Sequence, residues 1–164
     1  MNRRQRIQLV RRIATGIVVV LFAGRVHSAP VVPAPLLGTL NGPDYLISID
    51  RSTGNGTRIG PLGIGFGDAM TALEYDAIHH VLYGAVSAQT SGLFTVDPST
   101  GAATRVGEPD ALGIQATGMA HDPFNDIMYA AGGDIFFRKN LYEVDRTTGQ
   151  SHLLGPVAGV SDSL

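Results

Sequence analysis

The chain has 164 residues with neither cysteine nor tryptophan, which excludes disulfides, thiolate metal sites and cysteine nucleophiles. Its formal net charge is −2, but six of its 12 basic residues and none of its 14 acidic residues lie within residues 1–28. Without that segment the net charge is 6 − 14 = −8, which argues against nucleic acid and anionic membrane surfaces as partners, because both require a basic protein surface.

Residues 1–28 have the pattern of a signal peptide. An arginine-rich start is followed at 13–24 by an apolar run of 12 residues, which matches a signal-peptide core and is too short to span a bilayer. Val26 and Ser28 are small enough for the −3 and −1 positions of a cleavage site, so cleavage is predicted after Ser28. We therefore expect a secreted or periplasmic protein, with no other membrane association. A twin-arginine export route and an uncleaved membrane anchor are the alternatives.

A strand–turn–strand motif occurs three times after a Pro-rich lead at 29–35. The copies occupy 46–54, 93–101 and 141–149. Their turn aspartates, Asp50, Asp97 and Asp145, are 47 and then 48 residues apart. A fixed period of this length predicts a repeat architecture.

Each repeat is expected to contain four short strands. In the second repeat they are placed at 70–75, 80–86, 92–96 and 103–106. In the third they are placed at 117–121, 127–131, 140–144 and 152–154. Strands are favoured over helices, because each apolar run lasts only four to six residues before Asp, Pro or Gly ends it. The repeats then span 36–60 (a partial unit), 70–107 and 117–155, and 160–164 would begin another strand.

The strand before each turn alternates in polarity, and one of its faces is apolar in all three copies. That face carries Ile47 and Ile49, Phe94 and Val96, and Tyr142 and Val144. At the turn, an aspartate side chain can accept hydrogen bonds from the amides that follow, and a glycine can take the positive φ of a bulged hairpin. These turn residues are therefore assigned a structural role: Asp50, Gly54, Asp97, Gly101, Asp145 and Gly149. Calcium binding by the aspartates is the alternative.

The repeat resembles the blades of secreted bacterial β-propellers of the quinoprotein-like and YVTN-like superfamily. Residues 93–107 are similar to the blade motif L-Y-x-I-D-x-x-T-G-x-x-T-x-I-G, and 118–130 are similar to its G-L-A-x-D-P…L-Y-G half. The resemblance covers 36–155 and implies an all-β partial β-propeller of about three four-stranded antiparallel blades. Without tryptophan in the blades, a quinone cofactor is not expected.

A closed propeller usually has four to eight blades. Three blades therefore leave two interpretations. The chain is a piece of a longer propeller, or it closes a ring as a homo-oligomer, for example with two chains supplying six blades.

The resemblance places ligands at one mouth of the central channel, on the loops at 61–69, 87–91, 108–116 and 132–139. Asp68, Glu108 and Asp110 are the candidate Ca²⁺ ligands on these loops, because Ca²⁺ binds several carboxylate oxygens. Solvated loop carboxylates in an acidic protein are the alternative. No other cofactor is expected.

One loop departs from the repeat. Tyr129 and Leu141 are 12 positions apart, whereas the corresponding Tyr83 and Leu93 are 10 apart, so the third repeat carries a two-residue insertion. A loop that breaks the pattern is the better candidate for function. Its candidate ligand-binding or partner-binding residues are Asp134, Phe136, Phe137, Arg138, Lys139 and Asn140. The alternative is that the two phenylalanines pack against a neighbouring blade.

These features favour an exported, non-catalytic binding protein whose partner is a protein or a surface polymer. A lactonase-like hydrolase with carboxylate-bound Ca²⁺ and a small oligomeric lectin are the alternatives. The histidines His79, His80 and His121 show no clustering through their spacing and are expected in turns and half-buried strands.

Overall fold

The structure is a computed structural model that describes residues 17–20, 36–40, 42, 44–65, 67–87, 90–133 and 139–157. Within these ranges it contains twelve strands and no helix, which confirms the predicted all-β class. Accordingly, the part of the chain that the structure describes holds no helix with the length and apolarity needed to cross a membrane.

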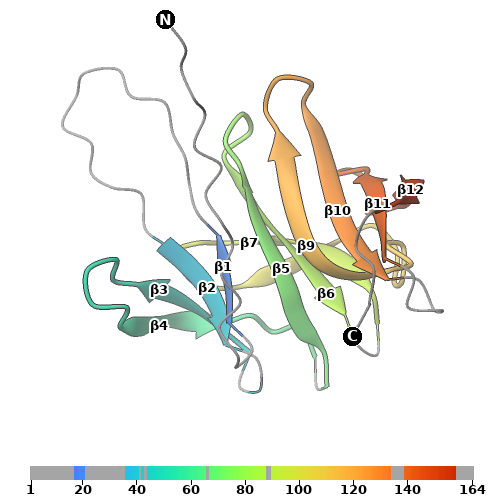
Figure 1. Cartoon of the computed structure of the whole chain (residues 1–164). Helices are drawn as coiled ribbons and strands as arrows, with labels where there is room; N and C mark the ends of the chain where they lie inside the picture. Colours follow the sequence, from blue (N-terminus) through green and yellow to red (C-terminus); the bar gives the residue numbers. More distant parts are fainter. Residues whose placement is uncertain are drawn as a thin grey trace, which may run out of the picture.

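The strands form three antiparallel four-stranded sheets, each built from strands consecutive in the sequence (Figure 1). The first sheet contains β1 (Ile17–Val20), β2 (Leu36–Leu40), β3 (Tyr45–Ile49) and β4 (Gly56–Pro61). The second contains β5 (Ala69–Asp76), β6 (Val81–Ser87), β7 (Gly92–Val96) and β8 (Ala103–Val106). The third contains β9 (Gln115–Asp122), β10 (Ile127–Gly133), β11 (Lys139–Val144) and β12 (Ser151–Pro156).

The observed strands follow the predicted ones closely after residue 36. The strands expected at 92–96 and 103–106 coincide with β7 and β8, and β9 begins two residues before its predicted start at 117. Strand β1 was not predicted as a strand, because its residues lie in the segment that the sequence assigns to a signal peptide. The rest of that segment, the Pro-rich lead and 160–164 lie outside the described residues.

The three hairpin turns have one construction. In the second, Asp97 Oδ1 accepts hydrogen bonds from the backbone N–H of Ser99 at 2.8 Å and from its hydroxyl at 2.7 Å. The backbone N–H of Gly101 donates to the Asp97 carbonyl, and Gly101 has a φ of 83°. These hydrogen bonds hold the pKa of Asp97 below its usual value. The turns that begin at Asp50 and Asp145 repeat the arrangement.

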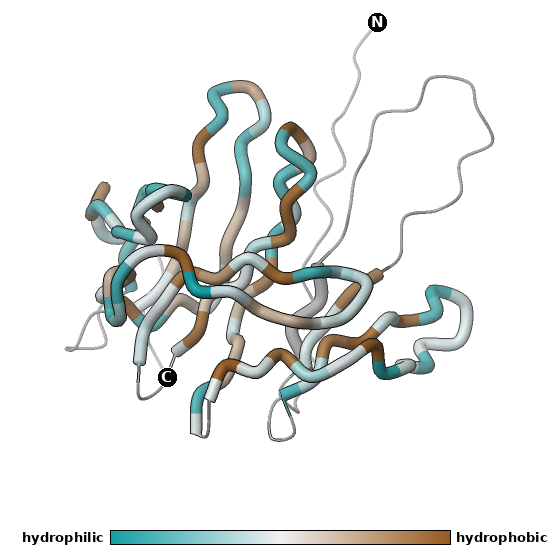
Figure 2. Tube along the Cα trace, turned by 180° about the vertical axis from the view of Figure 1, so that it is seen from behind, coloured by the Kyte–Doolittle hydropathy of each residue, from teal (hydrophilic) through white to brown (hydrophobic). Residues whose placement is uncertain are grey.

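The sheets pack face to face, with the segment between two sheets contributing to the core between them. Leu62 and Ile64, which follow β4, are buried in the core between the first and second sheets. Leu112 and Ile114, which follow β8, are buried in the core between the second and third. Figure 2 shows that apolar stretches lie mainly along the strands and polar stretches mainly at the turns. The first strands of neighbouring sheets also lie together, β1 against β5 and β5 against β9.

Both faces of the second sheet are buried, whereas the sequence pattern indicated only one apolar face. Phe94 is 4% exposed and belongs to the core with the first sheet, whereas Leu93, on the opposite face, is 0% exposed and belongs to the core with the third. The middle sheet is therefore covered on two sides. Leu141, the counterpart of Leu93 in the third sheet, is 37% exposed.

Candidate functional site

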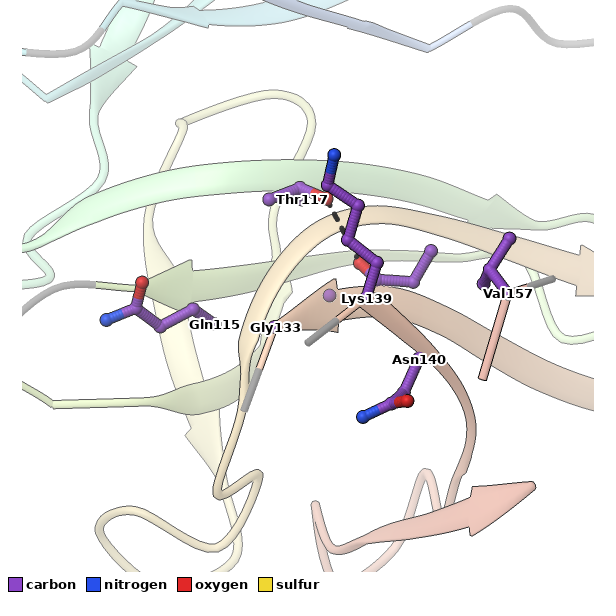
Figure 3. Close-up of a pocket in the computed structure, with 8 residues that line it drawn as sticks. Gln115, Thr117, Gly133, Lys139, Asn140 and Val157 are labelled. Atoms are coloured by element: carbon purple, nitrogen blue, oxygen red, sulfur yellow. Dashed lines mark hydrogen bonds between the residues drawn. The ribbon is translucent and has the colours of Figure 1, made fainter. Parts of the chain in front are cut away.

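A pocket of about 320 Å³ lies at the end of the third sheet that carries the irregular loop (Figure 3). It is formed by the start of β9, the end of β10, the start of β11 and the residue after β12. The lining residues are Gln115, Thr117, Ala131, Gly132, Gly133, Lys139, Asn140 and Val157.

The two-residue insertion creates this end of the sheet. In the second sheet, the β6–β7 ladder ends at the pair Val86–Gly92, with five residues between them. The corresponding pair in the third sheet is Gly132–Asn140, and the ladder continues to Gly133–Lys139, again with five residues between them. The insertion thus adds one residue pair to the hairpin, and that pair lines the pocket.

Two of the six predicted binding residues, Lys139 and Asn140, line the pocket from β11. Their side chains point to opposite sides of the strand, and Lys139 extends beside Thr117 (Figure 3). Asn140 is 8% exposed and its Nδ2 donates a hydrogen bond to the Tyr142 hydroxyl at 3.2 Å. The other four predicted residues, Asp134, Phe136, Phe137 and Arg138, lie outside the described residues.

The pocket combines one ammonium group with neutral polar groups. Lys139 is exposed and supplies the charge, and Gln115 adds an exposed amide. The Thr117 hydroxyl donates to the Ala131 carbonyl at 3.3 Å, which fixes its position on the pocket wall. This arrangement suits a ligand that carries a carboxylate together with hydroxyl or carbonyl groups.

Two of the three predicted calcium ligands, Asp68 and Asp110, hold loops together through their carboxylates. Asp68 accepts hydrogen bonds from the backbone N–H and the hydroxyl of Thr90, at 3.2 and 2.9 Å. Asp110 accepts a hydrogen bond from the backbone N–H of Ser91 at 2.8 Å. Glu108 is exposed. These three carboxylates do not make up a group close enough to share an ion among the described residues, and calcium binding here stays a prediction.

A cluster of two aspartates and a histidine lies at the end of the strands opposite to the pocket. Asp76 ends β5, His121 lies near the end of β9, and Asp126 lies in the turn before β10. His121 Nδ1 is 3.5 Å from Asp76 Oδ1, and His121 Nε2 is 3.1 Å from Asp126 Oδ1. One ligand atom from each residue lies within 4.8 Å of the others, a spacing that would allow a shared metal ion.

Arg146, from the turn after β11, binds both carboxylates of this group. Its guanidinium pairs with Asp76 and lies 2.8 Å from Asp126 Oδ1. Asp76 is fully buried, which opposes ionisation, but the His79 backbone N–H, the His79 ring and Arg146 hold its pKa at about 2. Because the guanidinium already binds both carboxylates, a metal ion would have to displace it. The group therefore acts as an ion-pair network that joins the second and third sheets.

The sequence interpretation missed this network. It treated His79 and His121 as isolated, and Asp76 and Arg146 are 70 residues apart. One signal was present, because the third turn has Arg146 where the second has Pro98. Periodicity aligns such positions, but it does not show that a turn of one sheet meets the first strand of the sheet before it.

No protein-family model, curated protein or solved structure matches this chain. The likeness of its repeat to propeller blades therefore rests on the residues quoted above. The two sites rest on their geometry alone.

Proposed function

We propose that this chain forms three blades of a β-propeller and is exported as a non-catalytic binding protein. Three sheets with one strand order and face-to-face packing support the propeller. The adjacency of the first strands β5 and β9 also supports it, since the first strands of propeller blades surround a central channel.

The pocket at the end of the third sheet is the proposed binding site. The observation that carries this proposal is the extra Gly133–Lys139 pair, because it places a pocket where the repeat is broken. The hairpins that recur in every repeat are explained by their role in folding. The insertion departs from the repeat and adds a cationic side chain beside a cavity, which favours a role in binding.

The proposed ligand is a surface polymer that carries carboxylates; it would contact the acidic chain only at the Lys139 pocket, so it does not need the extended basic surface that nucleic acid or an anionic membrane needs. The Lys139 ammonium would pair with a carboxylate, while the Gln115 amide would hydrogen-bond neighbouring hydroxyl groups. An exposed ion pair contributes about 0.2–1 kcal/mol, so Lys139 should account for up to about a fivefold part of the affinity.

Isothermal titration calorimetry with a soluble oligouronate tests the proposal, with a neutral oligosaccharide of equal length as the reference probe. The wild-type protein should bind the oligouronate in preference to the neutral probe. Lys139→Gln should weaken that binding by up to about fivefold, because it removes the charge while keeping a polar side chain.

Arg58→Gln is the matched control, since it removes one positive charge from the first sheet, where Arg58 lies over the Tyr45 ring. This variant should bind like the wild type. Equal losses in both variants would show unspecific charge attraction, and an absence of wild-type binding would reject carboxylate recognition.

A further inference from the structure

The two interfaces between the sheets are built from corresponding residues. The first sheet packs on the second through Leu37, Leu46 and Ile59, and the second packs on the third through Tyr83, Leu93 and Val106. These residues correspond pairwise, with spacings of 46 or 47. Leu46 and Leu93 are both 0% exposed.

The third sheet carries the same set on its outer face. Tyr129, Leu141 and Leu154 are the counterparts of Tyr83, Leu93 and Val106. Leu141 is 37% exposed and Leu154 is 48% exposed. Leu141 and Leu154 are thus more exposed than the counterparts that a neighbouring sheet covers, which makes this face suited to receive another sheet of the same repeat.

The receiving surface is repeated as well. The second sheet receives the first through Leu82, Phe94 and Val96, and the third receives the second through Met128, Tyr142 and Val144. In the first sheet the same positions hold Leu36, Ile47 and Ile49. These positions keep their apolar character in the first sheet, where Ile47 is 4% exposed and Leu36 and Ile49 are half-buried.

Each interface between consecutive sheets also has a close contact between two glycines. Gly60 at the end of β4 meets Gly101 in the turn of the second sheet, and Gly107 after β8 meets Gly149 in the turn of the third. Gly155 and Gly54 occupy the two remaining positions of this series. A Cβ built at either one would meet nothing within 4 Å.

The proposed contact between a third sheet and a first sheet would also bring opposite charges together. Arg146, in the turn of the third sheet, pairs with Asp76 at the end of the first strand of the second sheet. Arg51 occupies the same turn position in the first sheet, and Asp122 is the counterpart of Asp76 in the third. A first sheet packed on a third sheet would therefore bring Arg51 to Asp122.

We propose that the outer face of the third sheet binds the first sheet of a second copy of this chain, head to tail. If two copies form both contacts, the three described sheets of each copy close into a ring of 3 + 3 = 6. The extra Gly133–Lys139 pair extends beyond the repeat and stays at the rim.

The mass of the full-length gene product in solution is the first test, measured by sedimentation across a range of protein concentrations. The expected species has twice the mass of one chain. Leu141→Glu places a charge on the outer face and should reduce the mass to that of one chain. Leu153→Glu is the matched control, because Leu153 is also exposed but lies opposite Tyr142 in the ladder and hence on the other face; it should leave assembly intact.

A charge exchange provides the second test and identifies the direction of the contact. Arg51→Asp and Asp122→Arg should each prevent assembly, because each places like charges across the interface. A 1:1 mixture of the two variants should assemble, since one contact then keeps the native pair and the other has it reversed. Circular dichroism of each variant checks that its sheets are formed.

A wild-type protein with the mass of one chain at every concentration would overturn the proposal. So would a Leu141→Glu protein that assembles like the wild type, or a mixture of folded charge variants that stays unassembled. These masses are measured without ligand, so a monomer that binds the oligouronate would overturn only this inference, and a dimer that does not bind it would reject only the ligand site.

Discussion

At the scale of single residues, the turns of the three sheets show how one position can serve either folding or association. All three begin with an aspartate that binds the following backbone amides. The next position is Arg51, Pro98 or Arg146. Arg146 reaches the second sheet, where it neutralises the buried Asp76.

Replacement of Asp76 by asparagine should destabilise the protein and flatten its acid unfolding. The lowered pKa, about 2, means that the native state favours the ionised form. The stabilisation is therefore fully present above the unfolded pKa near 3.8 and is lost as the pH falls towards 2. At neutral pH, Asp76→Asn should lose about 2–3 kcal/mol, because Arg146 and the His79 amide lose a charged partner.

Urea unfolding at several pH values measures this effect. The difference between wild type and Asp76→Asn should shrink as the pH falls below about 4, which is near the unfolded carboxyl pKa. Asp122→Asn, the same change at the corresponding position of the third sheet, should cost less in a monomeric sample. A pH-independent difference would show that the ion pair does not stabilise the fold.

Alanine at Gly101 should destabilise the fold more than alanine at Gly54. Both glycines have positive φ, 83° and 75°, so each substitution costs about 1 kcal/mol in backbone strain. A Cβ at Gly101 would also lie 2.5 Å from the Gly60 carbonyl oxygen in the neighbouring sheet. We expect an additional loss of about 1–3 kcal/mol from this overlap. Thermal unfolding in dilute solution gives the comparison, and equal losses would contradict the close approach of the sheets.

At the scale of elements, the segments between sheets have a larger part in packing than their lack of secondary structure suggests. Leu112 is 0% exposed and lies in the core between the second and third sheets, although it belongs to no strand. Ser151 in β12 donates a hydrogen bond to its carbonyl at 2.7 Å. The segment is thus held between the sheets that it connects.

Leu112→Ala should therefore behave as a core substitution. The lost apolar contacts and the resulting cavity predict a loss of about 2–5 kcal/mol. Leu153→Ala removes the same atoms from a side chain that is 53% exposed, and it should change stability by less than about 1 kcal/mol. Urea denaturation compares them, and a small effect of Leu112→Ala would mean that the two sheets are not joined through this segment.

At the scale of the whole molecule, the two ends of the third sheet are assigned different roles. The loop end carries the pocket with Lys139, and the turn end carries the network of Asp76, His121 and Arg146. The outer face between them matches an internal interface residue by residue. Calorimetry and sedimentation therefore test the proposed ligand site and the proposed association independently.

The sequence by itself determined the strands and the turns, because both depend on local chemistry. Alternating apolar residues and the Asp–Gly spacing predicted β7 and β8 to the residue. The insertion between Tyr129 and Leu141 also pointed to the end of the sheet where the pocket lies.

Only the tertiary structure decided which faces are covered and which distant residues meet. Leu93 and Leu141 occupy the same place in the motif, yet one is buried and the other exposed, since a neighbouring sheet covers only the first. Asp76 and Arg146 meet because consecutive sheets pack face to face and bring a turn of one to the first strand of the other. A periodic sequence specifies equivalent positions, whereas burial and ion pairing depend on the neighbours that packing supplies.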